Sequence, residues 1–300
     1  MKCFYHVADL DGWCSAAIIR YKFPQCELIG MDYGYEFPWD SIKDNEPVYV
    51  VDFSLNPLED MVKLNKIAYL FWIDHHKTSL EFVEKNKLSS VIRNRIDLSK
   101  AACELTWEVF FPDKKMPIGV RLLGRYDVWD LTSSPYVLPF QYGMRTYAVD
   151  PGQCNDLMFD TCWGRIFDYD WEYVTQLINH GEIILKYKTK EERQYCEAYS
   201  FETELDGIPA IAVNRGRASS QLFESVWNPS THPIAIAYVK GRDYWNVTLY
   251  TTEDTGVDVS EIAKKYGGGG HKCAAGIQAE NIVFDNGVMK IEPLSSIRRY

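Results

Sequence analysis

The chain of 300 residues contains no apolar run of the ~18 to 20 residues that a membrane-spanning helix needs, so neither a transmembrane segment nor a membrane partner is expected. Its N-terminus runs from Met1 directly into a predicted strand without the pattern of a signal peptide, which favours a cytoplasmic location. The eight cysteines form no Cys-x-x-Cys pair, which excludes a zinc ribbon or a redox motif built on that spacing. Reduced and mostly buried thiols are therefore expected.

Positive charge is scarce as well. The chain carries 32 Lys and Arg residues against 42 Asp and Glu residues, which gives a formal net charge of -10. Proteins that hold long duplex DNA or RNA rely on many Lys and Arg contacts to phosphate, so such a partner is not expected. A short anionic substrate remains compatible with the sequence, because divalent cations bound among clustered aspartates reverse the local sign of the charge.

The remaining composition is that of a globular protein, with 46% hydrophobic and 25% charged residues, and the length suits two domains. The first 130 residues alternate strand-like and helix-like segments, which predicts an α/β fold with a parallel, helix-covered sheet. The expected strands are 2–7, 47–53 and 67–73, and the expected helices lie near 12–22, 57–65, 100–111 and 117–126. Residues 131–170, rich in Pro, Tyr, Asp and Gly, are interpreted as loops and short turns.

The second half of the chain has a different pattern. Residues 171–199 predict a long, partly exposed linker helix, because apolar residues recur at helical spacing before a charged stretch. Short strands are then expected at 200–204, 208–213, 233–239 and 244–250, separated by turn sequences. The predicted organisation is a parallel-sheet domain over 1–170, a linker helix over 171–199 and a smaller α/β domain with a mixed sheet over 200–300.

Acidic and histidine residues follow each of the predicted early strands. A single aspartate after a strand commonly begins a turn or caps the next helix, so each one alone is weak evidence of a site. The ends of parallel strands meet at one edge of a sheet, however, and a group of carboxylates gathered there needs cations to offset its repulsion. The residues expected to converge are Asp9, Asp11, Asp52 and Asp74, together with His6, His75 and His76. A metal site is therefore predicted.

The ligand types narrow the choice of metal. Oxygen-rich coordination with few imidazoles and no thiolate favours Mn²⁺ or Mg²⁺ over a structural zinc, with Co²⁺ or iron as substitutes, and we expect Mn²⁺. Two ions are expected, because Asp9 and Asp11 diverge from one loop and a strand-end carboxylate such as Asp52 could bridge ions ~3.5 to 4 Å apart. A further carboxylate is expected from Asp127 or Asp130, with an ordinary helix-terminal acid as the alternative.

With these residues in view, the N-terminal half resembles the DHH phosphoesterase superfamily, whose motif appears here as Asp74-His75-His76. The resemblance implies that the first domain is catalytic, that Asp74 orients the histidines and that His76 faces the scissile phosphate. It implies these ligands for the two metals: His6, Asp9 and Asp52 for one, and Asp11, Asp52, His75 and Asp127 for the other. Asp9 stands three residues after His6, whereas relatives usually have a spacing of two or four.

Four consecutive glycines, Gly267 to Gly270, follow a predicted helix over 257–266. One glycine would end the helix, whereas four followed by a histidine expose backbone N–H groups that can hold an anion; a flexible linker is the alternative. The segment resembles the C-terminal substrate-binding domain that accompanies many DHH proteins, which implies a grip on substrate phosphate across the cleft. The residues implicated by the resemblance are Gly268, Gly269, Gly270 and His271.

The predicted strand before that helix departs from the resemblance. Relatives often carry an Arg-Ser pair where this chain has Leu249 to Thr252. Tyr250 is expected either to stack on a base or to be an ordinary strand aromatic, and the sequence supports both interpretations equally. Arg217, together with Arg215, could supply the missing positive charge.

These expectations converge on a manganese-dependent phosphodiesterase that hydrolyses short oligonucleotides (nano-RNA or dinucleotides) to mononucleotides by a two-metal mechanism. An exopolyphosphatase or pyrophosphatase would use the same metal chemistry with a substrate site lined by Lys and Arg, whereas the aromatic side chains in 200–276 favour a nucleotide. A non-catalytic nucleotide-binding protein is the third alternative. A homodimer is compatible with the sequence, which determines no oligomeric state.

Overall fold

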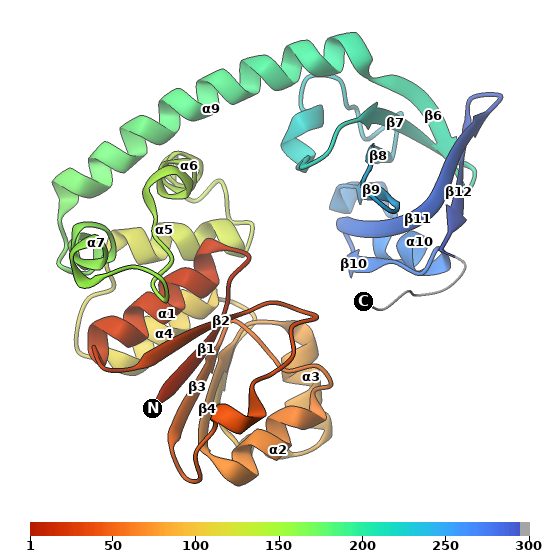
Figure 1. The fold of residues 1–300 in the computed structure, drawn as a ribbon. Helices are drawn as coiled ribbons and strands as arrows, with labels where there is room; N and C mark the ends of the chain where they lie inside the picture. The colour runs from red at the N-terminus through yellow and green to blue at the C-terminus, as the bar shows by residue number, and fades with distance from the viewer. Residues whose placement is uncertain (295–300) are drawn as a thin grey trace. The chain divides into compact units, whose positions relative to one another are not determined.

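The computed structural model describes residues 1–294 of the protein, which form two compact units. The first unit is Met1–Leu185, and the second begins at Lys186. The division falls inside one helix of 29 residues, α9 (Trp171–Tyr199), which runs from one unit into the other (Figure 1). Within residues 1–294, no helix has the length and apolar character required to cross a bilayer.

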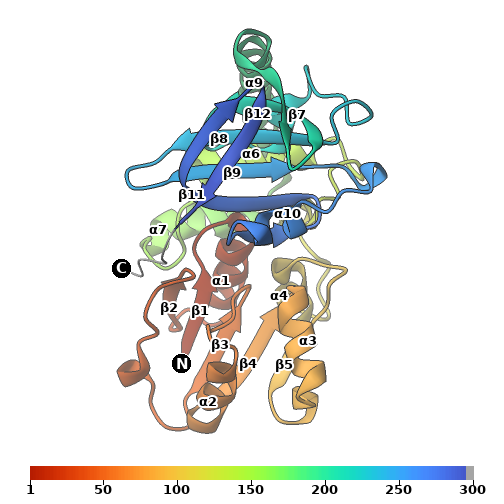
Figure 2. The same cartoon turned by 90° about the vertical axis from the view of Figure 1, so that its right-hand side faces the viewer.

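A five-stranded parallel sheet forms the centre of the first unit, and this confirms the α/β prediction. The strand order is β2-β1-β3-β4-β5 (Figure 2). The strands are β1 (Lys2–His6), β2 (Glu27–Met31), β3 (Pro47–Val51), β4 (Tyr69–Asp74) and β5 (Arg93–Ile96). The sequence did not predict β2 and β5, which are edge strands of mostly half-buried or exposed residues. β5 reads Arg-Asn-Arg-Ile and has no apolar run, and the short apolar run of β2 is interrupted by Gly30.

Helices cover both faces of this sheet. Successive residues of a strand point to opposite faces, so the apolar strands present buried side chains on both. On one face, Phe4 and Trp72 pack with residues of α2 and α3, and on the other, Tyr5 and Ile73 pack with residues of α1 and α4. Figure 1 shows these two pairs of helices on opposite sides of the strands. The helices of this part are α1 (Leu10–Lys22), α2 (Glu59–Ile67), α3 (Lys77–Lys85), α4 (Ala102–Phe110) and α5 (Ile118–Asp127).

Much of the segment 131–170 is helical, which corrects the expectation of loops and short turns. It contains α6 (Val137–Tyr147), α7 (Asp156–Phe159), a π-helical turn (Asp160–Gly164) and α8 (Arg165–Phe167). Phe140 of α6 and Trp163 are fully buried in the same apolar core. Gly143 of α6 lies where a Cβ atom would be only 2.1 Å from the carbonyl oxygen of Leu177 in α9. A glycine is needed here because α6 and α9 approach closely, and the local sequence gives no sign of this tertiary contact.

The second unit is built on a seven-stranded mixed sheet of order β10-β11-β12-β6-β7-β8-β9, in which β11 also pairs with β9. The predicted mixed sheet is therefore confirmed. Its strands are β6 (Phe201–Leu205), β7 (Ile208–Asn214), β8 (Ile234–Lys240), β9 (Trp245–Tyr250), β10 (Gly269–His271), β11 (Ala274–Asp285) and β12 (Val288–Pro293). One helix, α10 (Val259–Lys265), packs Val259 and Ile262 into the core of this unit.

Candidate metal centre

Three parallel strands deliver polar side chains to one edge of the first sheet. His6 is the last residue of β1, Asp52 follows β3 directly, and Asp74 ends β4 immediately before His75 and His76. The strands themselves are apolar and buried, so the polar residues can appear only where each strand ends. The carboxyl edge of a parallel sheet is the usual position of a ligand site in such folds.

The side chains converge as the sequence predicted. Asp9 Oδ2 lies 3.1 Å from His6 Nδ1, and Asp52 Oδ2 lies 3.8 Å from the same nitrogen. Around His75, Nε2 lies 3.3 Å from Asp52 Oδ1, 3.1 Å from Asp127 Oδ2 and 3.7 Å from Asp11 Oδ2. Three groups have ligand atoms within 4.8 Å of one another: His6 with Asp9 and Asp52; Asp11 with His75 and Asp127; and Asp52 with His75 and His76.

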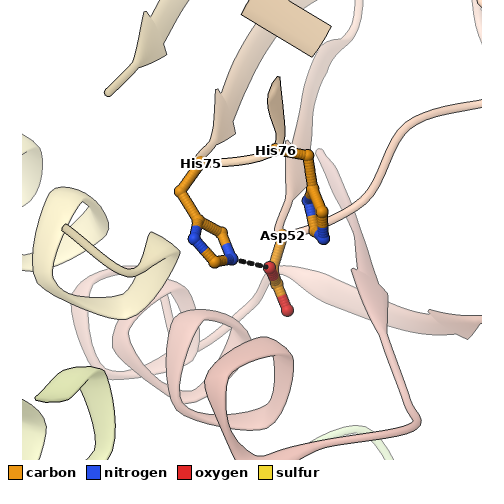
Figure 3. A group of neighbouring side chains, drawn as sticks. All are labelled: Asp52, His75 and His76. Atoms are coloured by element: carbon orange, nitrogen blue, oxygen red, sulfur yellow. Dashed lines mark ion pairs between the residues drawn. The ribbon is translucent and has the colours of Figure 1, made fainter. Parts of the chain in front are cut away.

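Asp52 belongs to two of these three groups, and Figure 3 shows its carboxylate with the His75 ring directed at it and His76 nearby. Its side chain is buried, yet neither carboxylate oxygen accepts a hydrogen bond, and Nδ1 of His6 also has no hydrogen-bond partner. A buried carboxylate that accepts no hydrogen bond is costly, because it has lost the solvation of water and the contact with His75 Nε2 at 3.3 Å compensates its charge only in part. A divalent cation between these groups would compensate the charge, so the residues present fit a metal site.

The pKa values follow from this crowding of buried charges. Burial raises the pKa of Asp11 to about 7, with a further contribution from the charge of Asp52. Burial, together with Asp11, likewise raises the pKa of Asp127 to about 7. Burial alone would lower the pKa of His75, but the nearby Asp52, Asp11 and Asp127 carboxylates raise it to about 10. The pKa of His6 is also about 10, because Asp52 and Asp9 outweigh its burial.

Asp11 is held by the start of α4. Its Oδ2 accepts a hydrogen bond of 2.8 Å from the backbone N–H of Ala102, and its Oδ1 accepts one of 2.8 Å from Cys103. The first N–H groups of a helix have no partner within the helix, so a carboxylate is stabilised at this position. Each oxygen has a second lone pair, and the same contacts that position Asp11 beside His75 leave it able to coordinate a cation.

The carboxylate of Asp74 contacts the two histidines of the motif differently. It contacts the ring of His76, but it contacts only the backbone N–H of His75. Its Oδ1 lies 2.7 Å from His76 Nδ1 and accepts the backbone N–H of His75 at 2.8 Å, while its Oδ2 accepts a hydrogen bond of 2.5 Å from Ser79 Oγ. The contact fixes the ring of His76 and leaves its Nε2 for another partner. The ring of His75 is positioned instead by Asp52 and Asp127, which narrows the predicted role of Asp74.

Two carboxylates were candidates for the end of α5, and the structure brings only one of them to the cluster. Asp127, the last residue of α5, faces His75. Asp130 instead forms an ion pair of 2.9 Å with Arg125 and accepts a hydrogen bond from the backbone of Ser133. Asp127 is in place because α5 ends beside the sheet edge, whereas Asp130 belongs to the turn that follows.

Sequence reasoning missed three residues around the site. Asp32 lies 3.6 Å from His6 Nε2, and it was missed because the edge strand that precedes it was not predicted. Gln141 and Arg145 of α6 join Asp9, Asp11 and Asp127 in lining a cavity of about 270 Å³. Gln141 is buried, and its Oε1 has no hydrogen-bond partner. Both α6 residues were overlooked because their segment had been interpreted as a loop.

The glycine run of the second unit is not the open loop that was expected. Gly269 to His271 form β10, which pairs with Ala274 to Gly276 of β11, and the N–H of Gly268 donates to the carbonyl oxygen of Ala263. A Cβ atom at Gly268 would lie 2.1 Å from the carbonyl oxygen of Gly276. These glycines therefore let β10 approach β11 closely. Some of the backbone groups that were expected to hold an anion are instead engaged in pairing within the protein. The side chain of His271 is exposed.

Tyr250 and Arg217 differ in accessibility. The ring of Tyr250 is buried in the core of the second unit, and its hydroxyl donates a hydrogen bond of 2.7 Å to the carbonyl oxygen of Ala218. Of the two interpretations that the sequence left open for Tyr250, the structure supports an ordinary core aromatic of its strand, and the base-stacking role is corrected. Arg217 is exposed, whereas Arg215 is paired with Glu191 at 2.8 and 3.0 Å and is not free to supply charge.

Comparisons with known proteins describe the fold of this chain. No family model matches the sequence. A curated but uncharacterized protein of Acanthamoeba polyphaga mimivirus is 26% identical over 306 residues, covering 93% of this chain and 67% of that protein.

Three solved structures are similar to the chain. The DHH domain of a protein described as a member of a family of ribosomal proteins has a TM-score of 0.59 at 12% identity, covering 92% of this chain and 82% of that one. A pGpG-specific phosphodiesterase of Vibrio cholerae has a TM-score of 0.56 at 13% identity and 92% coverage of both chains. An exopolyphosphatase-related protein of Bacteroides fragilis has a TM-score of 0.51 at 11% identity, covering 92% of this chain and 85% of that one.

Proposed function

We propose that this chain, which has the fold of the DHH-domain proteins it resembles, is a phosphoester hydrolase that depends on two divalent cations. The single observation that carries the proposal is the buried Asp52 carboxylate, which accepts no hydrogen bond and lies between two groups of metal-ligand side chains. His6, Asp9 and Asp52 would hold one cation. Asp11, Asp52, His75 and Asp127 would hold the other. Oxygen and imidazole ligands without a thiolate support Mn²⁺ as the ion.

The residues of the chain would divide the work of hydrolysis. When bound, two cations lower the pKa of water and offset the negative charge that develops on the phosphoryl oxygens. His76 would donate a proton from Nε2 to the leaving oxygen, because its Nδ1 already faces Asp74. The nearby Asp74 carboxylate raises the pKa of His76, so its ring is more often protonated than a free histidine at neutral pH. Asp74 would act by keeping this ring in place.

The proposed substrate is a short oligonucleotide that is cut to mononucleotides. The net charge of -10 disfavours long polymeric anions. The exposed His271, beside Lys272 and the β10 glycines, would hold a second phosphate of the substrate, with exposed Arg217 as a further cation. Similarity to a structure described as a pGpG-specific phosphodiesterase supports a dinucleotide as the first substrate to test.

Hydrolysis of polyphosphate or pyrophosphate is the second candidate function. Similarity to an exopolyphosphatase-related structure supports it, and the metal centre would serve both reactions. The two candidates differ in what surrounds the metals, since a polyphosphate needs several Lys and Arg side chains and a nucleotide needs a surface for its base.

The test is product formation from an RNA dinucleotide, a longer RNA, a cyclic dinucleotide, pyrophosphate and polyphosphate, each with Mn²⁺ and with a chelator. We expect rapid Mn²⁺-dependent cleavage of the dinucleotide and little action on the longer RNA. Asp52→Asn should lower turnover by about 10³-fold or more, because loss of metal stabilisation costs several kcal/mol. Asp130→Asn, outside the cluster, is the matched control. Phosphate release from polyphosphate alone would favour the second candidate, and full activity of Asp52→Asn would refute the two-metal assignment.

A further inference from the structure

A second cavity, of about 410 Å³, adjoins the metal centre within the first unit, and the proposed function does not yet use it. It is lined by the loop that follows β2 and by residues that follow β3. In its wall, Asp32 Oδ1 lies 3.6 Å from His6 Nε2, and the ring centroids of Tyr33 and His6 are 5.7 Å apart. A ligand held at the metals would therefore have this cavity as its neighbour.

Aromatic side chains of the loop divide into an anchored pair and an exposed pair. Phe37 packs against Phe4 with ring centroids 4.5 Å apart and against Trp39 at 4.7 Å, which fixes the loop to the apolar core. Tyr33 is 50% exposed although its ring contacts Phe53 at 5.2 Å, and Tyr35 is 62% exposed. Exposed rings on an anchored loop next to a phosphate site are suited to stacking on a nucleobase.

The charge of the cavity selects among ligands. Its lining includes Asp32, Glu36 and Asp60 and contains no Lys or Arg. A polyphosphate would be repelled here, whereas a group that donates N–H hydrogen bonds would be accepted. Asp32 already contacts His6 and accepts the backbone N–H of Tyr33 at 2.7 Å, whereas neither Glu36 nor Asp60 forms an ion pair with a described residue. Glu36 is exposed and Asp60 is half-buried, so Glu36 is the carboxylate more accessible to a ligand.

Resting on the proposed function, we propose that this cavity is a nucleobase subsite for the nucleotide next to the scissile phosphate. Tyr35 and Tyr33 stack on the base, and the carboxylate of Glu36 accepts hydrogen bonds from it. Guanine fits best, because its ring N–H and amino group are adjacent donors that the two oxygens of one carboxylate can accept together. The site would thus confer specificity for nucleotides over polyphosphate and for guanine over other bases.

Stacking is tested by the kinetics of Tyr35→Ala on a guanosine dinucleotide and on an abasic analogue with the same ribose and phosphodiester groups. We expect the KM for the dinucleotide to rise by ~5- to 150-fold, the range that corresponds to loss of one base–aromatic stack, and the KM for the abasic analogue to change much less. Tyr35→Phe keeps the ring and should restore most of the affinity. Tyr69→Ala is the matched control, because Tyr69 is 67% exposed at the opposite end of β4 from the site.

Base selection is tested by Glu36→Gln. This variant should raise the KM for a guanosine dinucleotide more than the KM for a uridine dinucleotide, and so reduce the preference for guanosine. If Tyr35→Ala raises the KM for the dinucleotide and for the abasic analogue equally, or raises neither, the subsite is refuted while the proposed hydrolase activity stands. If the wild-type protein cleaves no dinucleotide with Mn²⁺, the proposed function itself fails. The two failures are thus distinguished by the wild-type measurement alone.

Discussion

Asp52 combines burial, an absence of hydrogen bonds to its oxygens and a backbone φ of 52°. A φ in the left-handed region costs a residue with a side chain about 1–3 kcal/mol, although aspartate tolerates it better than most. The backbone N–H of Asp52 donates a hydrogen bond of 3.0 Å to the carbonyl oxygen of Ile73 in β4, which helps to hold the residue there. Unfavourable local features of this kind, concentrated at one residue, are characteristic of functional sites.

Metal affinity should depend strongly on pH. His6 and His75 have pKa values of about 10 and Asp11 and Asp127 of about 7 in the metal-free protein, so protons occupy the site at neutral pH. A cation binds the deprotonated ligands, and therefore each displaced proton makes the affinity rise by ~10-fold per pH unit below the pKa of that ligand.

We expect the affinity for Mn²⁺ to increase between pH 6 and pH 9, with release of protons into the buffer. Calorimetric titration in buffers of different ionisation enthalpy measures both quantities. An affinity that stays constant over this range without proton release would contradict the arrangement of ligands described above.

At the scale of single elements, β10 shows how a glycine run can serve packing as well as binding. The carbonyl oxygen of Gly276 leaves no room for a side chain at Gly268, whereas nothing lies within 4 Å of a Cβ atom at Gly269. Adjacent glycines of one motif therefore have different requirements, although the sequence presents them as equivalent.

Gly268→Ala should reduce the free energy of unfolding by about 1–3 kcal/mol, because a forced shift of β10 against β11 has the cost of overpacking. Gly269→Ala should change it by less than about 0.5 kcal/mol, as at most open surface positions. Chemical denaturation of the two variants makes the comparison. Equal destabilisation would mean that the glycines act by conformational freedom and not by close contact.

At the scale of the whole molecule, the predicted metal ligands all belong to the first unit, Met1–Leu185, and the predicted phosphate grip belongs to the second. Each unit has apolar core clusters of its own. The two therefore need not respond equally to a metal.

Mn²⁺ should stabilise the first unit against unfolding by about 2.7 kcal/mol at a free concentration 100 times its dissociation constant. Limited proteolysis at rising temperature, with cleavage sites assigned to each unit, would detect the selective effect. Asp52→Asn should abolish it. Protection of the second unit alone, or of neither, would place the metal elsewhere.

Local sequence determined the central strands and the long helix, and it predicted that polar residues gather where those strands end. The runs before His6, Asp52 and Asp74 are apolar and β-favouring, and the carboxyl ends of parallel strands must share one edge. This is why residues up to 68 positions apart, from His6 to Asp74, can be grouped from the amino-acid sequence alone, whereas the choice between Asp127 and Asp130 needed the structure.

Tertiary structure alone decided the features that depend on a neighbour. The edge strand β2, and with it Asp32, exists because β1 offers a partner for pairing. Helix α6 exists because its apolar residues meet a core and Gly143 meets α9. Tyr250 faces the core, and the exposed ring of Tyr33 lies beside His6 of the candidate metal centre. Burial and contact are properties of the folded chain, and they have no signal in the pattern of a single segment.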